Sequence, residues 1–226
     1  MQRARAGLFL LITSVLAACG SPPAPASPPA TPESLAPPPA PTVWTAREGV
    51  TLTTESGDVR LPHAFLRLDV LAADSQGLRV RCASCAEPRE GVVSRDAVIY
   101  QPARPSEAAR GSVAEFALAV RAAAAQRDIE ALREVMSQEF SFTFGGAEGR
   151  LEALAAWERE GYRSLDRLPA ILDRGVVNRW AAQPAQYDEL WVAPPEYLAS
   201  PEYLDLRAGF RKVGGEWRWV FFIGGD

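Results

Sequence analysis

The sequence has few of the residues from which catalytic and metal sites are usually built. Among 226 residues there are one histidine, three cysteines and two methionines. The histidine, His63, lies far from the C-terminal half, so a triad or dyad based on histidine is excluded there, and we interpret His63 as an exposed turn residue. Neither a cluster with metal-ligand spacing nor a glycine-rich phosphate loop is present. We therefore predict no catalytic residue, no metal site and no cofactor.

Positive charge is also scarce. The chain has 24 basic and 28 acidic residues and a net charge of −4. Arg3 and Arg5 are the only charged residues of positions 1–18, so the chain without that segment carries −6. Because a negative surplus opposes binding to a phosphate backbone, we expect no nucleic-acid partner.

Long hydrophobic runs are missing except at the start, where residues 1–18 have the layout of a secretory signal peptide. Arg3 and Arg5 precede an apolar stretch from Gly7 to Val15, and small residues follow. A membrane-spanning helix needs about 20 apolar residues, and here prolines end the run sooner. We expect this segment to direct export and to be removed.

The four residues from Leu16 to Cys19, Leu-Ala-Ala-Cys, resemble the lipobox of bacterial lipoproteins. The resemblance implies that Cys19 becomes the mature first residue and carries a diacylglyceryl group, often with a further chain such as palmitate on its amine. Two or more acyl chains give a stable membrane anchor. Gly20 stands where Asp retains Gram-negative lipoproteins in the inner membrane, so the resemblance implies the outer membrane, facing the periplasm. A plain signal peptide cut near a coincidental cysteine is the alternative.

Residues 19–42 form a proline-rich linker after the cleavage site. Ten of the chain's 19 prolines lie between Pro22 and Pro41. Such a segment favours polyproline II, so about 20 residues extend roughly 60 Å. We expect a solvated stalk, and a docking motif for proline-binding domains is the alternative.

Residues 43–102 have the pattern of a small all-β domain. Short apolar runs between turn residues predict strands at Val50–Thr53, Phe65–Ala72, Leu78–Arg81 and Val92–Val98. Their spacing of about ten residues is typical of a barrel.

The run from Gly91 to Val98, Gly-Val-Val-Ser-Arg-Asp-Ala-Val, resembles the end of bacterial Src-homology-3-like (SH3-like) domains. That family commonly has Gly-Trp-Val-Ser followed by an acidic and an aliphatic residue. Val92 replaces the aromatic, so a peptide groove built on that ring is not expected here. Such modules often bind cell-wall peptides or pack beside another domain, so the resemblance implies peptidoglycan or an envelope protein as partner.

Cys82 and Cys85 remain as a pair once Cys19 carries lipid. The exported compartment is oxidising and the domain is small, so a disulfide between them is expected to add about 2 kcal/mol. The same Cys-x-x-Cys spacing occurs in thioredoxin-like redox pairs and in half of a zinc site. Pro88 and Gly91 indicate a loop where a redox pair needs the start of a helix, and we predict a structural disulfide.

Residues 106–226 have the pattern of an α+β domain. The predicted helices begin at the capping box Ser112–Glu115, at Asp128, at Leu151 and at Ser164, the last one weakened by Pro169 and ending near Gly175. Alternation of Phe140, Phe142 and Phe144 predicts a strand ended by Gly145 and Gly146, and Trp191–Ala193 predicts another.

The last 23 residues predict a β-hairpin. Gly214 and Gly215 separate two alternating runs and indicate a two-residue turn. The expected cross-strand pairs on one face are Phe210 with Trp219, Ala208 with Phe221, and Leu206 with Ile223. The same register places Arg211 opposite Arg218, which is unfavourable unless Glu216 lies across them.

The order helix, helix, strand, helices and antiparallel strands resembles the cone fold of the ketosteroid-isomerase-like and nuclear-transport-factor-2-like superfamily. An unrelated α+β sandwich is the alternative. In a cone, Trp180, Tyr187 and Trp191 are candidates to rim a pocket.

Enzymes of the cone superfamily usually place Asp, His or Tyr in the cavity, and no such motif matches here residue by residue. Two carboxylate pairs are candidates for a general acid and base, Glu158 with Glu160 and Asp188 with Glu189. Neither spacing places both members on one face of a helix or strand, so we interpret them as solvated.

The sequence thus predicts a lipid-anchored envelope protein with two domains, an SH3-like barrel followed by an α+β domain. Because no nucleophile with its base is recognisable, we expect a non-enzymatic binding or scaffold module. A small-ligand carrier or enzyme that uses a carboxylate in a cone is the alternative.

Overall fold

The computed structural model describes residues 40–143, 149–179, 189–199 and 205–224. These residues all belong to one compact unit, Leu35–Asp226. The predicted signal peptide, Cys19 and most of the linker lie outside the described residues. Within the described ranges, no helix is long and apolar enough to cross a membrane.

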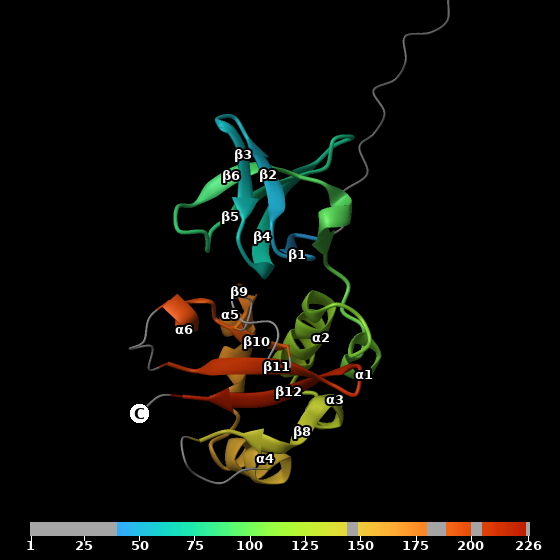
Figure 1. Cartoon of the computed structure of the whole chain (residues 1–226), viewed down its shortest axis with the longest axis vertical. Coiled ribbons are helices and arrows are strands. Elements are labelled where there is room, and N and C mark those ends of the chain that lie inside the picture. The colour runs from blue at the N-terminus through green and yellow to red at the C-terminus, as the bar shows by residue number, and fades with distance from the viewer. Residues whose placement is uncertain (1–39, 144–148, 180–188, 200–204, 225–226) are drawn as a thin grey trace, which may run out of the picture. The chain divides into compact units, whose positions relative to one another are not determined.

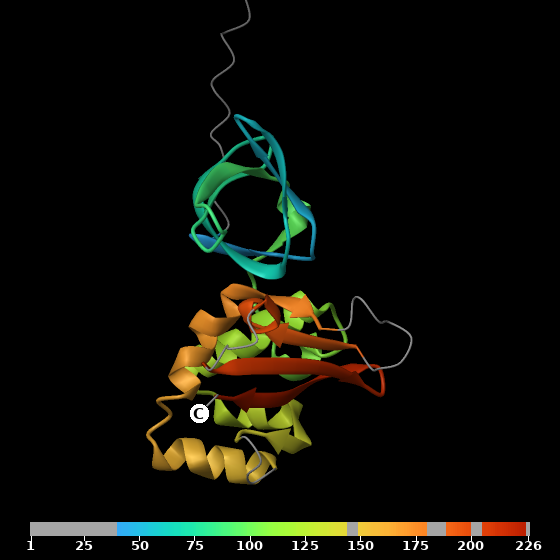
Figure 2. The ribbon, with the colours of Figure 1, turned by 60° about the vertical axis from the view of Figure 1, so that its left-hand side comes forward.

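The first part of the described chain is all-β. Its strands are β1 Thr42–Thr45, β2 Val50–Thr54, β3 Gly57–Leu61, β4 Ala64–Ala73, β5 Leu78–Cys82, β6 Arg89–Val93 and, after the 3-10 turn Arg95–Ala97, β7 Val98–Ile99. They pair in the order β3-β2-β6-β5-β4, with β1 joined to β4 and β7, and they curl around a common interior (Figure 2). Buried aliphatic side chains such as Leu52, Leu68 and Leu78 fill that interior.

The second part combines helices with the rest of the sheet. Its helices are α1 Pro105–Ala108, α2 Val113–Gln126, α3 Ile129–Val135, α4 Arg150–Arg159, the 3-10 helix η2 Leu165–Arg167, α5 Leu168–Leu172 and α6 Glu196–Ala199. Its strands are β8 Met136–Ser141, β9 Arg174–Asn178, β10 Leu190–Ala193, β11 Arg207–Val213 and β12 Glu216–Ile223. Strands β9 to β12 are antiparallel and β8 is parallel to β12, so the whole is a mixed sheet with helices (Figure 1).

The helix starts follow the predicted caps. Glu115 N–H donates to the Ser112 hydroxyl at 3.2 Å, and Ser112 N–H donates back to the Glu115 carboxylate at 2.7 Å, which confirms the capping box. Ala131 N–H donates to Asp128 at 3.1 Å, which confirms the second cap. Both caps satisfy backbone donors that a first helical turn leaves unpaired.

Three local predictions are wrong. The expected strand Val92–Val98 is interrupted after Val93, because the Ser94 hydroxyl donates to Asp96 and Ala97 N–H donates to the Ser94 carbonyl at 3.1 Å, which forms a turn. Strands β1 and β3, which carry polar residues at several positions, were not predicted, and neither was helix α6. Phe144, Gly145 and Gly146 lie outside the described residues.

Gly175 does not cap the fourth helix as predicted. The helix divides at Leu168 into η2 and α5, with Pro169 in the first turn of α5, and Gly175 lies in β9. Its φ is +104°, and a Cβ there would lie 2.9 Å from the Cβ of His63. Glycine is therefore needed at this position for a close approach between β9 and the start of β4.

The C-terminal hairpin forms with the predicted register near its turn. Phe210 faces Trp219 and Arg211 faces Arg218, and Arg218 donates to Glu216 at 2.8 Å as expected. A bulge between Gly209 and Phe210 then shifts the pairing, so the predicted partners of Ala208 and Leu206 are wrong. The observed pairs are Gly209 with Phe221, Ala208 with Phe222 and Arg207 with Ile223. The Phe221 ring occupies the space that a side chain at Gly209 would need, which favours the shift.

We predict that replacing both Gly214 and Gly215 with valine destabilises the protein by about 2–4 kcal/mol. Their φ angles are +59° and +88°, which a β-branched residue adopts at a cost of about 1–2 kcal/mol each. Equilibrium denaturation in urea measures the change, with the exposed neighbour substitution Val213→Thr as control. Equal midpoints for the double variant and the wild type would contradict the turn assignment.

Strand β4 belongs to both parts of the sheet. Ala64 and Leu66 pair with β9, and the following residues pair with β1 and β5. Between them Phe65 has a φ of +56°, so its side chain enters the core of the second part while Leu66 enters the core of the first. The Thr45 hydroxyl donates to the His63 carbonyl at 3.0 Å and accepts from Leu66 N–H at 2.9 Å, which fixes this bend.

The buried carboxylate of Asp173 joins three elements beside this bend. Trp44 Nε1 donates to it at 2.8 Å, and Arg121 donates to its two oxygens at 2.6 Å and 2.9 Å. The Arg121 guanidinium also lies 4.8 Å from the centroid of the Trp44 ring, which in turn stacks on Phe65 at 5.6 Å. Charge-assisted bonds in a water-poor site are strong, so this cluster fixes β1 and α2 against the α5–β9 corner.

We predict that Asp173→Asn lowers the free energy of unfolding by about 3 kcal/mol, because it leaves the Arg121 cation without its counter-charge in a mostly buried site. Asp166→Asn is the matched control, since Asp166 also binds one arginine, Arg127, through two oxygens but on the surface. The control loses about 1 kcal/mol or less. Losses of equal size in urea denaturation would show that the Asp173 cluster contributes no more than a surface ion pair.

Candidate functional site

A cleft of 510 Å³, the β3 cleft, lies where four segments of the chain meet. One wall is residues 59–63, which form the end of β3 and the turn into β4. The other is residues 84–87 and Arg89, from the loop between β5 and β6, and the cleft ends at Arg174, Pro195 and Glu196. Leu66 lies in its floor.

The first wall is the edge of a strand. Val59, Arg60 and Leu61 all line the cleft although neighbouring side chains of a strand point to opposite faces. The cleft therefore runs along the edge of β3. Leu61 is buried, Val59 is half-buried and Arg60 is exposed, so this wall is apolar below and charged at the rim.

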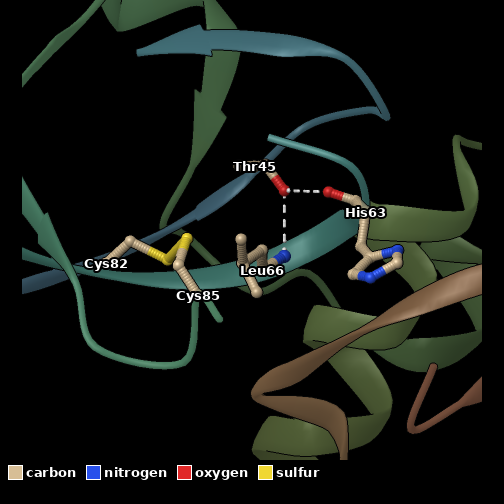
Figure 3. Close-up of a disulfide and its surroundings, with 5 residues drawn as sticks. All are labelled: Thr45, His63, Leu66, Cys82 and Cys85. Atoms are coloured by element: carbon tan, nitrogen blue, oxygen red, sulfur yellow. Dashed lines mark hydrogen bonds between the residues drawn. A yellow bond between two sulfur atoms is a disulfide. The ribbon is translucent and has the colours of Figure 1, made fainter. Parts of the chain in front are cut away.

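The second wall is held by the disulfide between Cys82 and Cys85, whose Cα atoms are 5.6 Å apart, and the predicted pairing is confirmed. Cys82 is buried at the end of β5, and Cys85 lines the cleft. Figure 3 shows Leu66 between the disulfide and His63. No group of three or more His, Cys, Asp or Glu side chains that could hold a metal ion occurs in the described part of the chain.

The polar end of the cleft is formed by His63, Arg174 and Glu196. Arg174 binds Glu196 Oε1 at 2.9 Å, whereas Glu196 Oε2 is buried and has no hydrogen bond within the described residues. His63 Nδ1 is also buried without a hydrogen bond to any described group. The prediction that His63 is exposed is wrong: its side chain is half-buried, and Gly175 packs closely against it.

Burial lowers the pKa of His63 below its usual value, and the charge of Glu196 opposes this effect. The imidazole is therefore neutral near neutral pH, with one nitrogen donating and the other accepting. Together with Glu196 Oε2 it offers buried hydrogen-bonding capacity that a bound molecule can use.

A second, larger pocket of 760 Å³ is lined by residues 53–56, by Arg79 of β5 and by residues of β6, and it shares Glu87 and Arg89 with the β3 cleft. There Glu90 binds Arg81 at 2.6 Å and Arg79 at 3.5 Å, so its main charges are already paired. Val92, which replaces the aromatic of SH3-like domains, lines this pocket. The arrangement offers less to a ligand than the β3 cleft does.

Of the three predicted pocket aromatics, only Trp191 lies among the described residues. Trp180 and Tyr187 lie outside the described residues. Trp191 is half-buried in β10, faces Phe210 and donates to Glu189 at 2.7 Å. Trp157 and Trp219, expected in the core, are buried and stacked at 5.5 Å.

The candidate acid–base pairs have other partners or lie apart. Glu160 accepts from the Ser164 hydroxyl at 2.9 Å, and Glu158 is exposed on α4. Asp188 lies outside the described residues, and its neighbour Glu189 binds Trp191. Glu160 is thus held by Ser164, and the pair of Asp188 with Glu189 stays a prediction.

The β3 cleft itself holds Ser84, His63 and Glu196, residue types that occur in catalytic triads. No hydrogen bond joins these three side chains among the described residues, and an activated serine requires one to its base. The arrangement therefore suits binding better than acyl transfer.

Sequence reasoning missed Arg174, Glu196 and the β3 wall. Arg174 comes from the expected end of a helix, no element was predicted at Glu196, and β3 was not recognised as a strand. The adjacent prolines Pro194 and Pro195 were the one available signal, since they stop regular structure just before Glu196.

The chain matches no protein-family model, no curated protein and no solved structure. The resemblances drawn from its motifs therefore stay predictions, and function must be argued from the site.

We predict that His63 makes the protein less stable in mild acid. Because the folded-state pKa lies below the unfolded value of about 6.5, the unfolded chain binds the extra proton first, and stability falls as the pH drops through about 6.5. His63→Gln keeps a polar side chain but removes this titration. Urea denaturation from about pH 7.5 to about pH 5 is expected to show a smaller loss for the variant than for the wild type, and parallel curves would contradict the assignment.

Proposed function

We propose that this chain is a lipid-anchored protein of the bacterial envelope whose folded part binds a partner without catalysing a reaction. Three features of the sequence support the location: the basic and apolar start, the Leu-Ala-Ala-Cys motif at Cys19 and the proline-rich linker. We propose the outer membrane as the site of anchoring, with the folded part in the periplasm. The Cys82–Cys85 disulfide suits such an oxidising compartment.

We also propose that the all-β part is an SH3-like barrel and that the second part is related to the cone fold. The antiparallel order of the short strands and the run from Gly91 to Val98 support the barrel. Two helices, a strand, further helices and a terminal antiparallel hairpin support the cone, with an unrelated α+β sandwich as the alternative.

The observation that carries the binding function is the β3 cleft. It combines an apolar floor with two buried hydrogen-bonding atoms, Glu196 Oε2 and His63 Nδ1, that have no partner among the described residues. Buried polar groups are nearly always hydrogen-bonded in native proteins and their complexes. A partner that fills the cleft and satisfies these atoms accounts for both features.

The proposed partner is another component of the envelope, either a protein or peptidoglycan. A photo-reactive amino acid placed at Ala86, which is exposed in the cleft, is expected to form a discrete cross-linked product in intact cells. The same residue at Ala72, which is exposed on β4 and lines none of the pockets described above, is the matched control. The product must also weaken when Val59→Asp places a charge in the cleft wall. Equal labelling from both positions, or none from Ala86, would remove the basis for this function.

We predict that Cys19→Ser leaves the protein folded but releases it from membranes, because the acyl chains require the cysteine sulfur and amine. Phase separation in detergent measures the change: the wild type is expected in the detergent phase and the variant in the aqueous phase. Cys85→Ser is the control, since it replaces a cysteine and breaks the disulfide but leaves the anchor. Equal partitioning of Cys19→Ser and the wild type would contradict lipidation at Cys19.

A further inference from the structure

The first wall of the β3 cleft is a strand that pairs with a neighbour on one side only. All five residues of β3 pair with β2, from Gly57 opposite Thr54 to Leu61 opposite Val50. In the described part of the chain β3 pairs with no other strand, and it ends the strand order. Since backbone groups of a strand point alternately to its two sides, the edge of β3 that borders the cleft presents unused donors and acceptors.

We propose that the β3 cleft accepts an extended segment of a partner protein, which pairs with β3 as an added strand. This inference rests on the proposed binding function and names the class of partner. An added strand satisfies the exposed edge through its own backbone and places alternate side chains against the apolar floor. Leu61, Leu66 and Cys85 offer that floor.

The polar end of the cleft defines one side chain of the segment. A carboxylate oxygen only accepts hydrogen bonds, so Glu196 Oε2 needs a donor. Arg174 already neutralises the charge of Glu196 at 2.9 Å, so a further cation would meet the arginine. The segment therefore carries a neutral donor here, a hydroxyl or an amide, which also bonds to the neutral His63.

The charges that line the rest of the cleft define a second side chain of the bound segment. Glu87 binds Arg89 at 3.1 Å and Glu196 binds Arg174, so four of the five charges that line the cleft are paired. Arg60 has no ion pair within the described residues, so the lining of the cleft carries one net positive charge. The chain as a whole carries a net charge of −4. An acidic residue of the segment complements Arg60. Arg60 lies in β3 and His63 in the turn that follows it, so the acidic residue of the segment lies beside β3 and its donor residue beside the turn.

A random octapeptide display library selected on the purified folded part tests this partner class. We expect enriched peptides with apolar residues, an acidic residue and a hydroxyl or amide residue that keep a constant spacing from one peptide to the next. Arg60→Glu is expected to weaken an enriched peptide at least about tenfold, whereas Arg79→Glu, an exposed arginine of the second pocket, leaves its affinity unchanged. Thermal unfolding confirms that both variants are folded. Failure to enrich any peptide, or equal effects of the two variants, overturns the proposal.

Methylation of the peptide backbone then separates strand addition from binding by side chains alone. Because only alternate N–H groups face β3, N-methylation at one set of alternate positions is expected to reduce affinity at least about tenfold, while methylation at the other set has little effect. Equal effects of both sets would overturn strand addition.

Cross-linking at Ala86 distinguishes this inference from the function on which it rests. If the product contains glycan and no peptide is selected, the cleft still binds an envelope partner and only the peptide proposal fails. If Ala86 yields no product in cells, the binding function fails as well.

Discussion

The buried carboxylate of Asp173 is the constraint on which the cleft depends. It follows α5 directly and precedes β9, so the bonds from Trp44 and Arg121 fix the position of this corner. The next residue, Arg174, lines the cleft and holds Glu196. A single carboxylate thus connects the packing of α2 and β1 with the polar end of the β3 cleft. A hydrophobic residue at this position could fill the same space, but it could not orient two donors from different elements.

The bend in β4 adds a second constraint. Phe65 has a backbone conformation that costs a bulky residue about 1–3 kcal/mol, and it persists because the surroundings require it. Thr45 holds the residues on both sides, and the Phe65 ring gains the stack on Trp44. His63 lies just before this bend, half-buried, and lines the same end of the β3 cleft as Glu196. The strained residue Phe65 therefore lies two positions from His63, which lines the β3 cleft.

Features set by neighbouring residues could be predicted from the sequence, and features set by distant contacts could not. The capping box at Ser112, the hairpin turn at Gly214 and the disulfide all depend on residues within a few positions of one another. Gly175 looked like a helix cap, because the sequence cannot show that His63 approaches it. The change of strand register between Gly209 and Phe210 depends on the packing of the Phe221 ring. The alternation of apolar and polar residues in the sequence does not show this packing. The cleft joins segments more than 100 positions apart in the chain, so no local pattern could reveal it.

Strand β4 pairs with β1, β5 and β9 and contributes side chains to both cores. Because β4 is part of both cores, unfolding of one core displaces β4 and so disrupts the other core as well. We therefore expect the described part to unfold in a single cooperative transition, and a molecule bound in the cleft to raise the midpoint of that transition for the whole of it. Such coupling means that a protein with an occupied cleft resists proteolysis along its entire folded length, whereas one with an empty cleft is cleaved sooner.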